Sequence, residues 1–442
     1  SYQAYPCEII FETEMWFDIE RDEQAHQALS TEEENLLLSI CTPNGKTLPI
    51  FINGRAGSGK STLLQYIFCL YAVRKLNDLE GEIVYLTYSD QLRQNAADIA
   101  QRVLKTHYQF TERYKGKNRA DDKEIAKLVQ KSFRTFEQLM LNMLPEYEQK
   151  QYQPQNRISF YRFRQDFFFR HLSKTPVKYS PETAWHVIRA YIKGREAGYI
   201  LTPDDYSNIP EKDKTIDIET YQYIYEKVWP RYKEYLEKNH YWDDLDLVNR
   251  VLLLSADELP SFMAIFCDEA QDFTKTQLAL ILRLSEFSRY DLRDTGTILS
   301  IPLVFAGDPL QTLTPTGFNW DRFTSMFYDE LQQKLLINDP GIYLRDKRMD
   351  LNYNYRSDVG IVKFSNVIQF LRMATLDEAC KPQKCWFEDT SVSDENIPGN
   401  IANSTTKYFI FGDNLQEKDF EDYAIESVII LPNEEGGLQT FI

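Results

Sequence analysis

Apolar residues occur in short runs that alternate with longer stretches of helical spacing. The run "LPIFING" (48–54) predicts a strand that leads into a glycine-rich loop. The next segment, "STLLQYIFCLYAVRKL" (61–76), has apolar residues three or four positions apart, which is typical of an amphipathic helix. "GEIVYLTYSD" (81–90) then predicts a second buried strand. This order of strand, loop, helix and strand indicates the start of an α/β domain with a parallel sheet.

The pattern changes between residues 101 and 235, where the chain is mostly helical and shows no buried-strand run. Strands return in "FMAIFCDEAQD" (262–272) and "IPLVFAGDPLQ" (301–311). The simplest interpretation is one parallel sheet interrupted by a helical insertion. We therefore predict a first lobe from residues 1–100 and 236–350 and a helical accessory insertion at 101–235. Residues 351–442 form a further, incomplete unit, in which "KYFIFG" (407–412) and "SVIILP" (427–432) are expected to be strands.

Composition and charge exclude some classes of protein. The 442 residues carry a net charge of −17, which argues against a protein that coats nucleic acid by bulk charge. The six cysteines are scattered, so we expect reduced thiols in a cytoplasmic protein. No apolar run approaches the roughly 18 residues of a membrane helix, so no membrane partner is expected.

The loop after the first strand has the pattern of a phosphate-binding site. Gly54 to Ser61 match G-x-x-x-x-G-K-[ST]. Glycines let backbone N–H groups converge on phosphates, Lys60 adds a positive charge, and the Ser61 hydroxyl can bind Mg²⁺. A chance glycine-rich turn is the alternative, but the strand before it and the helix after it favour the phosphate loop. The candidate nucleotide-binding residues are Gly54, Arg55, Ala56, Gly57, Ser58, Gly59, Lys60, Ser61 and Thr62.

Two carboxylates follow the buried strand at 262–267. An acid at the position of Asp268 can hold Mg²⁺ together with Ser61. The adjacent Glu269 can accept a proton from the attacking water. A solvated acidic turn is the alternative. Together with the phosphate loop, these residues predict hydrolysis of a nucleoside triphosphate.

Four stretches in this order, "GRAGSGKST", "DEAQD", "FAGDPLQ" and "NYNYRS", resemble the UvrD/Rep-like helicases of superfamily 1. Weaker similarity lies in "YLTYSDQLRQNA", "RTFEQLM" and "WDDLDLV". The resemblance covers roughly residues 29–360 and implies two RecA-like lobes, each interrupted by an accessory domain. Residues 351–442 are then the beginning of the second RecA-like lobe. ATP with Mg²⁺ would bind between the lobes, and single-stranded or partly duplex DNA would cross their top.

The resemblance also implies roles for single residues. Gln311 would sense the γ-phosphate, and Arg356 would reach it from the second lobe, since an arginine fork can neutralise transition-state charge. Tyr88, Ser89 and Thr135 fall in the short motifs expected to contact DNA.

Three features depart from the family pattern. Glu33 stands near the place of the glutamine that usually reads adenine, which puts the nucleotide preference in doubt because a carboxylate cannot donate to N7. In "QTLTPTGFNW", Phe318 or Trp320 could stack on bases, or either could belong to the core. The later motifs of the second lobe do not follow "SVIILP", so we expect a fragment of a longer protein rather than a vestigial lobe.

The insertion holds a candidate DNA surface. Residues 157–174 contain five basic residues, one acid and six aromatics, a mixture that suits single strands because bases stack on rings while cations follow phosphates. Arg162 and Arg164 are the basic residues expected to face the strand. The alternative is a helix with an aromatic core face, and the spacing of Phe160, Phe163, Phe167 and Phe168 favours that packing.

Two functions are consistent with these features. The first is an ATP-driven helicase or translocase on single-stranded DNA. The alternative is an ATP-dependent switch or interaction module that does not translocate. ATP turnover that a DNA strand stimulates many-fold would favour the first.

Overall fold

The computed structural model describes most of the chain. The described residues are 49–77, 80–115, 120–172, 177–211, 214–286, 302–311, 348–376 and 381–385, together with 33, 37, 320, 321, 323–325, 327, 328, 429–432 and 438–441. They divide into two compact units, Ser1–Thr390 and Ser391–Ile442.

The first unit is built on a six-stranded sheet in which all neighbours run parallel. The strand order is β3-β2-β4-β5-β1-β6. The strands are β1 (Ile50–Gly54), β2 (Glu82–Thr87), β3 (Phe133–Thr135), β4 (Phe262–Cys267), β5 (Leu303–Gly307) and β6 (Arg348–Leu351). The predicted α/β fold with a parallel sheet is therefore confirmed.

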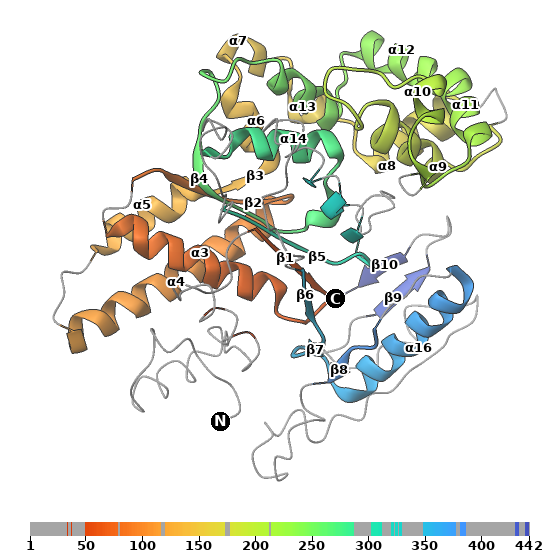
Figure 1. Ribbon diagram of the computed structural model, residues 1–442. Coiled ribbons are helices and arrows are strands. Elements are labelled where there is room, and N and C mark those ends of the chain that lie inside the picture. The colour runs from red at the N-terminus through yellow and green to blue at the C-terminus, as the bar shows by residue number, and fades with distance from the viewer. Residues whose placement is uncertain are drawn as a thin grey trace. The chain divides into compact units, whose positions relative to one another are not determined.

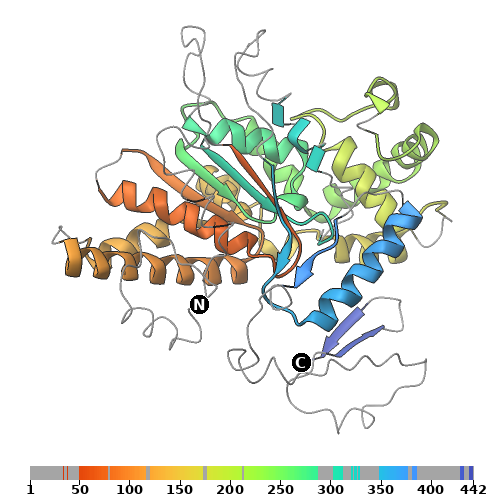
Figure 2. The ribbon, with the colours of Figure 1, turned by 60° about the horizontal axis from the view of Figure 1, so that its bottom comes forward.

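Helices cover both faces of this sheet, as Figure 1 shows and the turned view in Figure 2 repeats. Side chains of β1 alternate: Phe51 enters one apolar core, and Ile50 and Ile52 enter the other. The core around Ile50 is closed by α3 (Lys60–Leu76), α4 (Asp90–Lys115) and α5 (Asp122–Ser132). The core around Phe51 is closed by α6 (Phe136–Met143), α13 (Asp244–Leu252) and α14 (Lys275–Leu284).

A helical body with its own core is inserted between α6 and α13. Its core is rich in aromatic residues such as Phe163, Trp185 and Tyr221. The two ends of this body lie side by side, because the Ile158 N–H donates to the Trp242 carbonyl at 2.7 Å. The short helix α7 (Glu146–Gln149) precedes this body. The helices of the body are η1 (Pro154–Asn156), α8 (Phe160–Arg162), η2 (Phe163–His171), α9 (Pro181–His186), η3 (Val187–Ile192), α10 (Pro203–Ser207), α11 (Ile218–Lys227) and α12 (Trp229–Asn239).

One expectation about the insertion is wrong. Residues 101–235 were expected to contain no buried strand, but β3 pairs with β2 in the sheet. Three residues are too few for a periodic pattern to identify a strand. The helices before and after β3, α5 and α6, also pack on the two sheet faces. The boundaries of 101 and 235 otherwise stay a prediction.

After β6 the first unit continues with β7 (Tyr353–Asn354), α16 (Val359–Leu376) and β8 (Lys384–Cys385), and β7 pairs with β8. The second unit contains an antiparallel pair, β9 (Ile429–Pro432) and β10 (Leu438–Phe441). β9 lies in the predicted strand 427–432, β10 was not expected, and the predicted strand 407–412 lies outside the described residues. In the described ranges, no helix has both the length and the apolar character needed to cross a membrane.

Candidate functional site

The glycine-rich loop connects β1 to α3. Gly57 and Gly59 have φ values of 74° and 83°, in the left-handed region that favours glycine. A Cβ at Gly54 would lie 2.2 Å from the Ser58 Oγ, so this position also excludes a side chain unless Ser58 moves. The nine candidate nucleotide-binding residues, 54–62, all lie in this loop, at the end of β1 or in the first turn of α3. Backbone N–H groups at such a helix start favour a bound anion.

The lysine of the loop and the acidic strand end come together. The Lys60 side chain is buried, and its Nζ donates to the Arg55 carbonyl at 3.3 Å. The Ser61 side chain hydrogen-bonds the carboxylate of Asp268, which directly follows β4. Tyr85, on the neighbouring β2, donates its hydroxyl to Asp268 Oδ2 at 3.1 Å. These residues therefore meet at the carboxyl ends of the parallel strands.

Burial and neighbouring charges act on the Asp268 carboxyl in opposite directions. Burial and the neighbouring charge of Glu269 raise the pKa of the Asp268 carboxyl to about 6. The hydrogen bond from Ser61 and the charge of Lys60 act in the opposite direction. A divalent cation beside this group would favour its ionised form. A hydroxyl and a carboxylate are oxygen ligands of the kind that Mg²⁺ prefers, so this pair fits the predicted metal.

Glu269 has an unusual backbone conformation. Its φ is 56°, a value that is uncommon for a residue with a side chain and costs about 1 kcal/mol or more. Its N–H donates to Asp268 Oδ1 at 3.0 Å, and its carboxylate accepts a hydrogen bond from the Gln271 side-chain amide. These two hydrogen bonds hold the backbone of Glu269 to Asp268 and its carboxylate to Gln271.

Gln271 connects this carboxylate to the end of β5. Its side chain is fully buried, and its Oε1 accepts the backbone N–H of Asp308 at 2.9 Å. Asp308 Oδ2 in turn accepts from the side-chain amide of Gln311 at 2.6 Å. The exposed Gln311 is thus linked to Glu269 through two intervening residues.

The segment with the predicted Arg356 lies against the phosphate loop. The Tyr355 N–H donates to the Gly57 carbonyl at 2.8 Å, and the Asn354 Nδ2 donates to the Ala56 carbonyl at 3.1 Å. A Cβ at Gly57 would lie 2.8 Å from Asn354 Oδ1, so this close approach also needs glycine. The Asn354 Oδ1 accepts the backbone N–H of Arg356 at 2.9 Å, while the Arg356 side chain is exposed.

Glu33 is buried beside the last glycine of the loop. A Cβ at Gly59 would lie 2.3 Å from Glu33 Oε1 and 3.8 Å from the ring of Tyr355. The acid that stands near the place of the usual glutamine therefore lies next to the phosphate loop. Its effect on nucleotide preference stays a prediction.

A comparison with protein families identifies the family of the chain. The model of the UvrD/REP helicase N-terminal domain matches residues 39–313, more than half of the chain. The chain belongs to the UvrD/REP helicase family. A search of curated proteins found no match. Membership in the UvrD/REP family confirms the predicted resemblance and supports a superfamily 1 helicase with ATPase activity in general.

The predicted DNA-contacting residues of the first lobe have roles within this UvrD/REP domain. The Tyr88 hydroxyl donates to Gln277 Oε1 at 3.3 Å. The Ser89 Oγ accepts the Leu92 N–H at 3.1 Å at the start of α4. Thr135 caps α6 by accepting the Gln138 N–H at 3.1 Å. These contacts position the loops, and DNA binding by the three residues stays a prediction.

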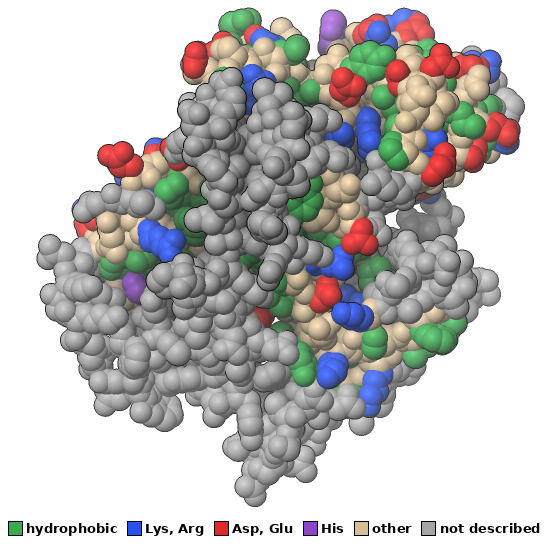
Figure 3. Space-filling model, in the orientation of Figure 1, with side chains coloured by type: hydrophobic (Ala, Val, Ile, Leu, Met, Phe, Trp, Pro, Cys, Tyr) green, Lys and Arg blue, Asp and Glu red, His purple; other side chains and the backbone are tan. Residues whose placement is uncertain are grey.

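The two arginines predicted to face a strand are engaged within the insertion. Arg162 donates to the carbonyls of Gln155 and Arg157, each at 2.7 Å, and lies over the ring of Tyr241. The Arg164 guanidinium lies 3.8 Å from the Glu182 carboxylate. Figure 3 shows acidic and basic side chains interspersed on the visible face of the insertion.

The aromatic residues of the insertion mostly form its core. Phe163, Phe167 and Phe168 are buried, which agrees with the core alternative. Tyr161 and Phe169 are exposed. The insertion therefore offers isolated exposed rings rather than a continuous aromatic platform on this helix.

Trp320 does not provide the predicted stacking platform. Its side chain is only 4% exposed in the core around Phe51, and its Nε1 donates to Asn53 Oδ1 at 2.8 Å. An indole that is buried in the core and hydrogen-bonded through its Nε1 cannot stack on a base without leaving the core. The alternative candidate, Phe318, lies outside the described residues.

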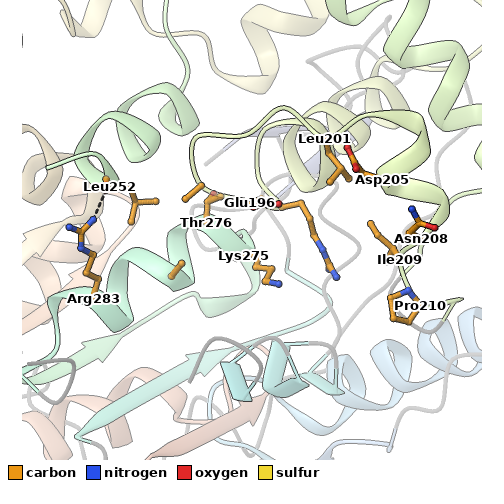
Figure 4. A pocket seen from close by; sticks show the side chains of 13 residues that line it. Glu196, Leu201, Asp205, Asn208, Ile209, Pro210, Leu252, Lys275, Thr276 and Arg283 are labelled. Carbon is orange, nitrogen blue, oxygen red and sulfur yellow. Dashed lines mark hydrogen bonds between the residues drawn. The ribbon is translucent and has the colours of Figure 1, made fainter. Parts of the chain in front are cut away.

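A cavity of about 780 Å³ lies between the insertion and α14. Figure 4 shows Lys275, Thr276 and Arg283 on the α14 side, and Asp205 and Pro210 on the side of the insertion. The Arg283 guanidinium is held by the Leu252 and Leu254 carbonyls. Basic, acidic and apolar side chains share the walls, so the lining does not select one class of ligand.

Several residues of the nucleotide site were not singled out from the sequence. Gln271, Asp308 and Asn354 lie inside the motifs that carry the resemblance, but the pattern does not tell which of them holds its neighbours in place. Tyr85 belongs to an ordinary apolar strand, and no sequence signal marks its contact with Asp268.

Proposed function

We propose that this chain is the ATP-hydrolysing part of a motor that moves on single-stranded DNA. The observation that carries the proposal is the meeting of Ser61, Lys60 and Asp268 at the carboxyl edge of one parallel sheet. Such an arrangement suits a magnesium triphosphate, because hard oxygen ligands and a positive charge converge beside a helix start.

The residues of this chain divide the chemistry among them. Lys60 and the backbone of the loop would bind the phosphates, and Ser61 with Asp268 would hold the metal. Bound Mg²⁺ would neutralise charge on the phosphate oxygens. Glu269 accepts a proton from the attacking water, and Gln271 orients its carboxylate.

Gln311 and Arg356 couple hydrolysis to movement in this proposal. Gln311 is joined to the base through Asp308 and Gln271, so a change at the γ-phosphate reaches the end of β5. Arg356 projects from a segment that is hydrogen-bonded to the phosphate loop. An arginine in that place can stabilise charge that develops in the transition state.

An ATP-dependent switch that does not translocate is the second candidate. It is favoured by the engagement of Arg162, Arg164 and Trp320 in contacts within the fold. A switch would bind and hydrolyse ATP at the same site without a large effect of a DNA strand.

ATP turnover with and without single-stranded DNA tests the proposal. A motor should hydrolyse ATP many-fold faster with the strand, whereas an unchanged rate favours the switch. Lys60→Ala should lose most turnover while remaining folded. The exposed lysine of α5, in the variant Lys123→Ala, is a matched control that should retain wild-type activity. Normal turnover in folded Lys60→Ala would refute the assignment of the phosphate loop.

A further inference from the structure

A buried polar cluster joins the insertion to the first lobe. Arg189, on η3 of the insertion, forms an ion pair with Asp244, the first residue of α13. Asp244 Oδ2 accepts from the side-chain amide of Gln277 on α14 at 3.1 Å. Gln277 Oε1 accepts the hydroxyl of Tyr88 at 3.3 Å. One chain of contacts thus runs from the insertion to the loop after β2.

A second ion pair fixes the same junction. The Lys193 Nζ lies 2.6 Å from both carboxylate oxygens of Asp243 and 2.7 Å from Asp246 Oδ1. The side chains of Lys193 and Asp243 are 3% and 4% exposed. The backbone adds a further link, because the Thr276 N–H donates to the Gly194 carbonyl at 3.1 Å. The cavity of Figure 4 lies at the same junction, since Thr276 lines it.

Gln277 also holds the start of the helix that follows the acidic strand end. Its Oε1 accepts the Thr274 N–H at 2.8 Å and the Thr274 hydroxyl at 3.1 Å. The Thr274 Oγ1 accepts the Gln277 N–H in return, which completes a capping box at α14. Only η5 (Ala270–Asp272) and Phe273 separate this cap from Glu269. The cap that Gln277 holds is therefore close in the chain to Glu269, the proposed general base.

We propose that Gln277 is a positioning residue that couples the insertion and the Tyr88 loop to the nucleotide site. The proposal rests on the proposed function, since it concerns how a bound strand accelerates ATP hydrolysis. The hydrogen bonds of the Gln277 side chain go to Thr274, Tyr88 and Asp244. Gln277 acts by holding α14, Tyr88 and the Arg189–Asp244 pair in one arrangement.

A glutamine suits this position because both ends of its amide are used. The oxygen accepts from Thr274 and Tyr88, and the nitrogen donates to Asp244. The side chain is fully buried, so water cannot replace a lost partner. A glutamate has the same shape and keeps the acceptor, but it cannot donate to Asp244 and adds a second carboxylate beside it.

The test compares ATP turnover of Gln277→Glu with wild type, with and without single-stranded DNA. We expect the stimulation by the strand to fall about tenfold, within the range known for residues that lie between two coupled sites. The turnover without the strand and the KM for ATP should stay within about twofold of wild type, because every residue at the phosphates is retained.

Arg189→Lys tests the same chain of contacts from the insertion. It keeps a positive charge opposite Asp244 but loses the guanidinium fork, so the stimulation should fall in the same direction. Glu219→Gln is the matched control, since it breaks the exposed pair with Lys178 on the same insertion and should leave the stimulation unchanged. Thermal melting of each variant reports whether it is folded.

Four results would overturn the proposal. Wild-type stimulation in both folded variants would show that the contacts do not couple the sites. An equal fall of the stimulated and unstimulated rates, or a failure of both variants to fold, would assign the cluster a purely structural role. If single-stranded DNA does not stimulate the ATP turnover of wild type, the proposed motor function is refuted, and the coupling that rests on it is refuted as well.

Discussion

Asn354 provides a sharp test of how the segment that carries Arg356 is held against the phosphate loop. Its side chain is buried and makes four hydrogen bonds. Two donate from Nδ2 to the Ala56 carbonyl and to Gln383 Oε1, at 3.1 Å and 3.2 Å. The other two are accepted by Oδ1 from the backbone N–H groups of Arg356 and Ser357, at 2.9 Å and 2.8 Å.

Asn354→Ala removes all four bonds, but the segment keeps part of its anchoring. The Tyr355 N–H still donates to the Gly57 carbonyl at 2.8 Å, so the segment is loosened rather than released. The two bonds to the backbone of Arg356 and Ser357 are the ones that orient the arginine. At about 0.5–1.5 kcal/mol each, their loss amounts to about 2 kcal/mol. If Arg356 acts in the transition state, kcat should fall about 10- to 30-fold.

The assay is steady-state ATP hydrolysis together with thermal melting. Asn354→Asp separates the two kinds of bond, because it keeps acceptors for the backbone N–H groups of Arg356 and Ser357 but loses the donor to Ala56. It should therefore raise KM, since a new negative charge lies beside the phosphate loop, and should lower kcat less than Asn354→Ala does. The control is Asn239→Ala, at an exposed asparagine that ends α12. A kcat within about twofold of wild type in folded Asn354→Ala would refute this role of the asparagine.

Three further predictions concern the base, the junction and its charge. Glu269→Gln should bind ATP but turn it over at least about 100-fold more slowly, and unchanged turnover would place the base elsewhere. Gly194→Ala should lower the free energy of unfolding by about 1–3 kcal/mol in urea titrations, because the added Cβ would lie 1.9 Å from the Arg189 carbonyl oxygen. A change under about 0.5 kcal/mol would contradict this steric clash. Burial raises the pKa of Asp244, but the charge and the hydrogen bond of Arg189 outweigh burial and hold that pKa below 3.8. Folding therefore favours the ionised form of Asp244. Removing the Asp244 charge also lowers the raised pKa of the neighbouring Asp243, so the ion pair is tested in acid. Below about pH 4 the stability difference between wild type and Asp244→Asn should shrink, and a difference that grows there would contradict the ion pair.

Much of the geometry of the candidate nucleotide site was predictable because it depends on residues that are close in sequence. The phosphate loop needs glycines at fixed positions for its left-handed turns, and Gly57 and Gly59 have those conformations. A carboxylate directly after a buried strand must lie at the edge of the sheet, which is where Asp268 is found. Parallel strands then bring such ends together without further information.

Other parts depend on contacts that no local pattern carries. The hydrogen bond of Asn354 to Ala56 joins residues 298 positions apart, and that of Gln277 to Tyr88 spans 189 positions. Trp320 follows a mostly polar stretch of sequence, and only the packing around Phe51 decides that its ring is buried rather than exposed. β3 gains its identity as a strand from pairing with β2, since three residues have no periodicity of their own.

The sequence by itself determined the parallel α/β sheet, the phosphate loop and the acidic strand end, because each follows from backbone geometry and polarity within about ten residues. The tertiary structure alone decided which side chains hold these parts together, and which arginines and aromatic rings are used inside the fold. The physical reason is that a hydrogen bond or an ion pair depends on distances of a few ångströms between groups that can lie hundreds of residues apart. Those distances are set by how helices pack on the two faces of the sheet, and not by the residues next to each group in the chain.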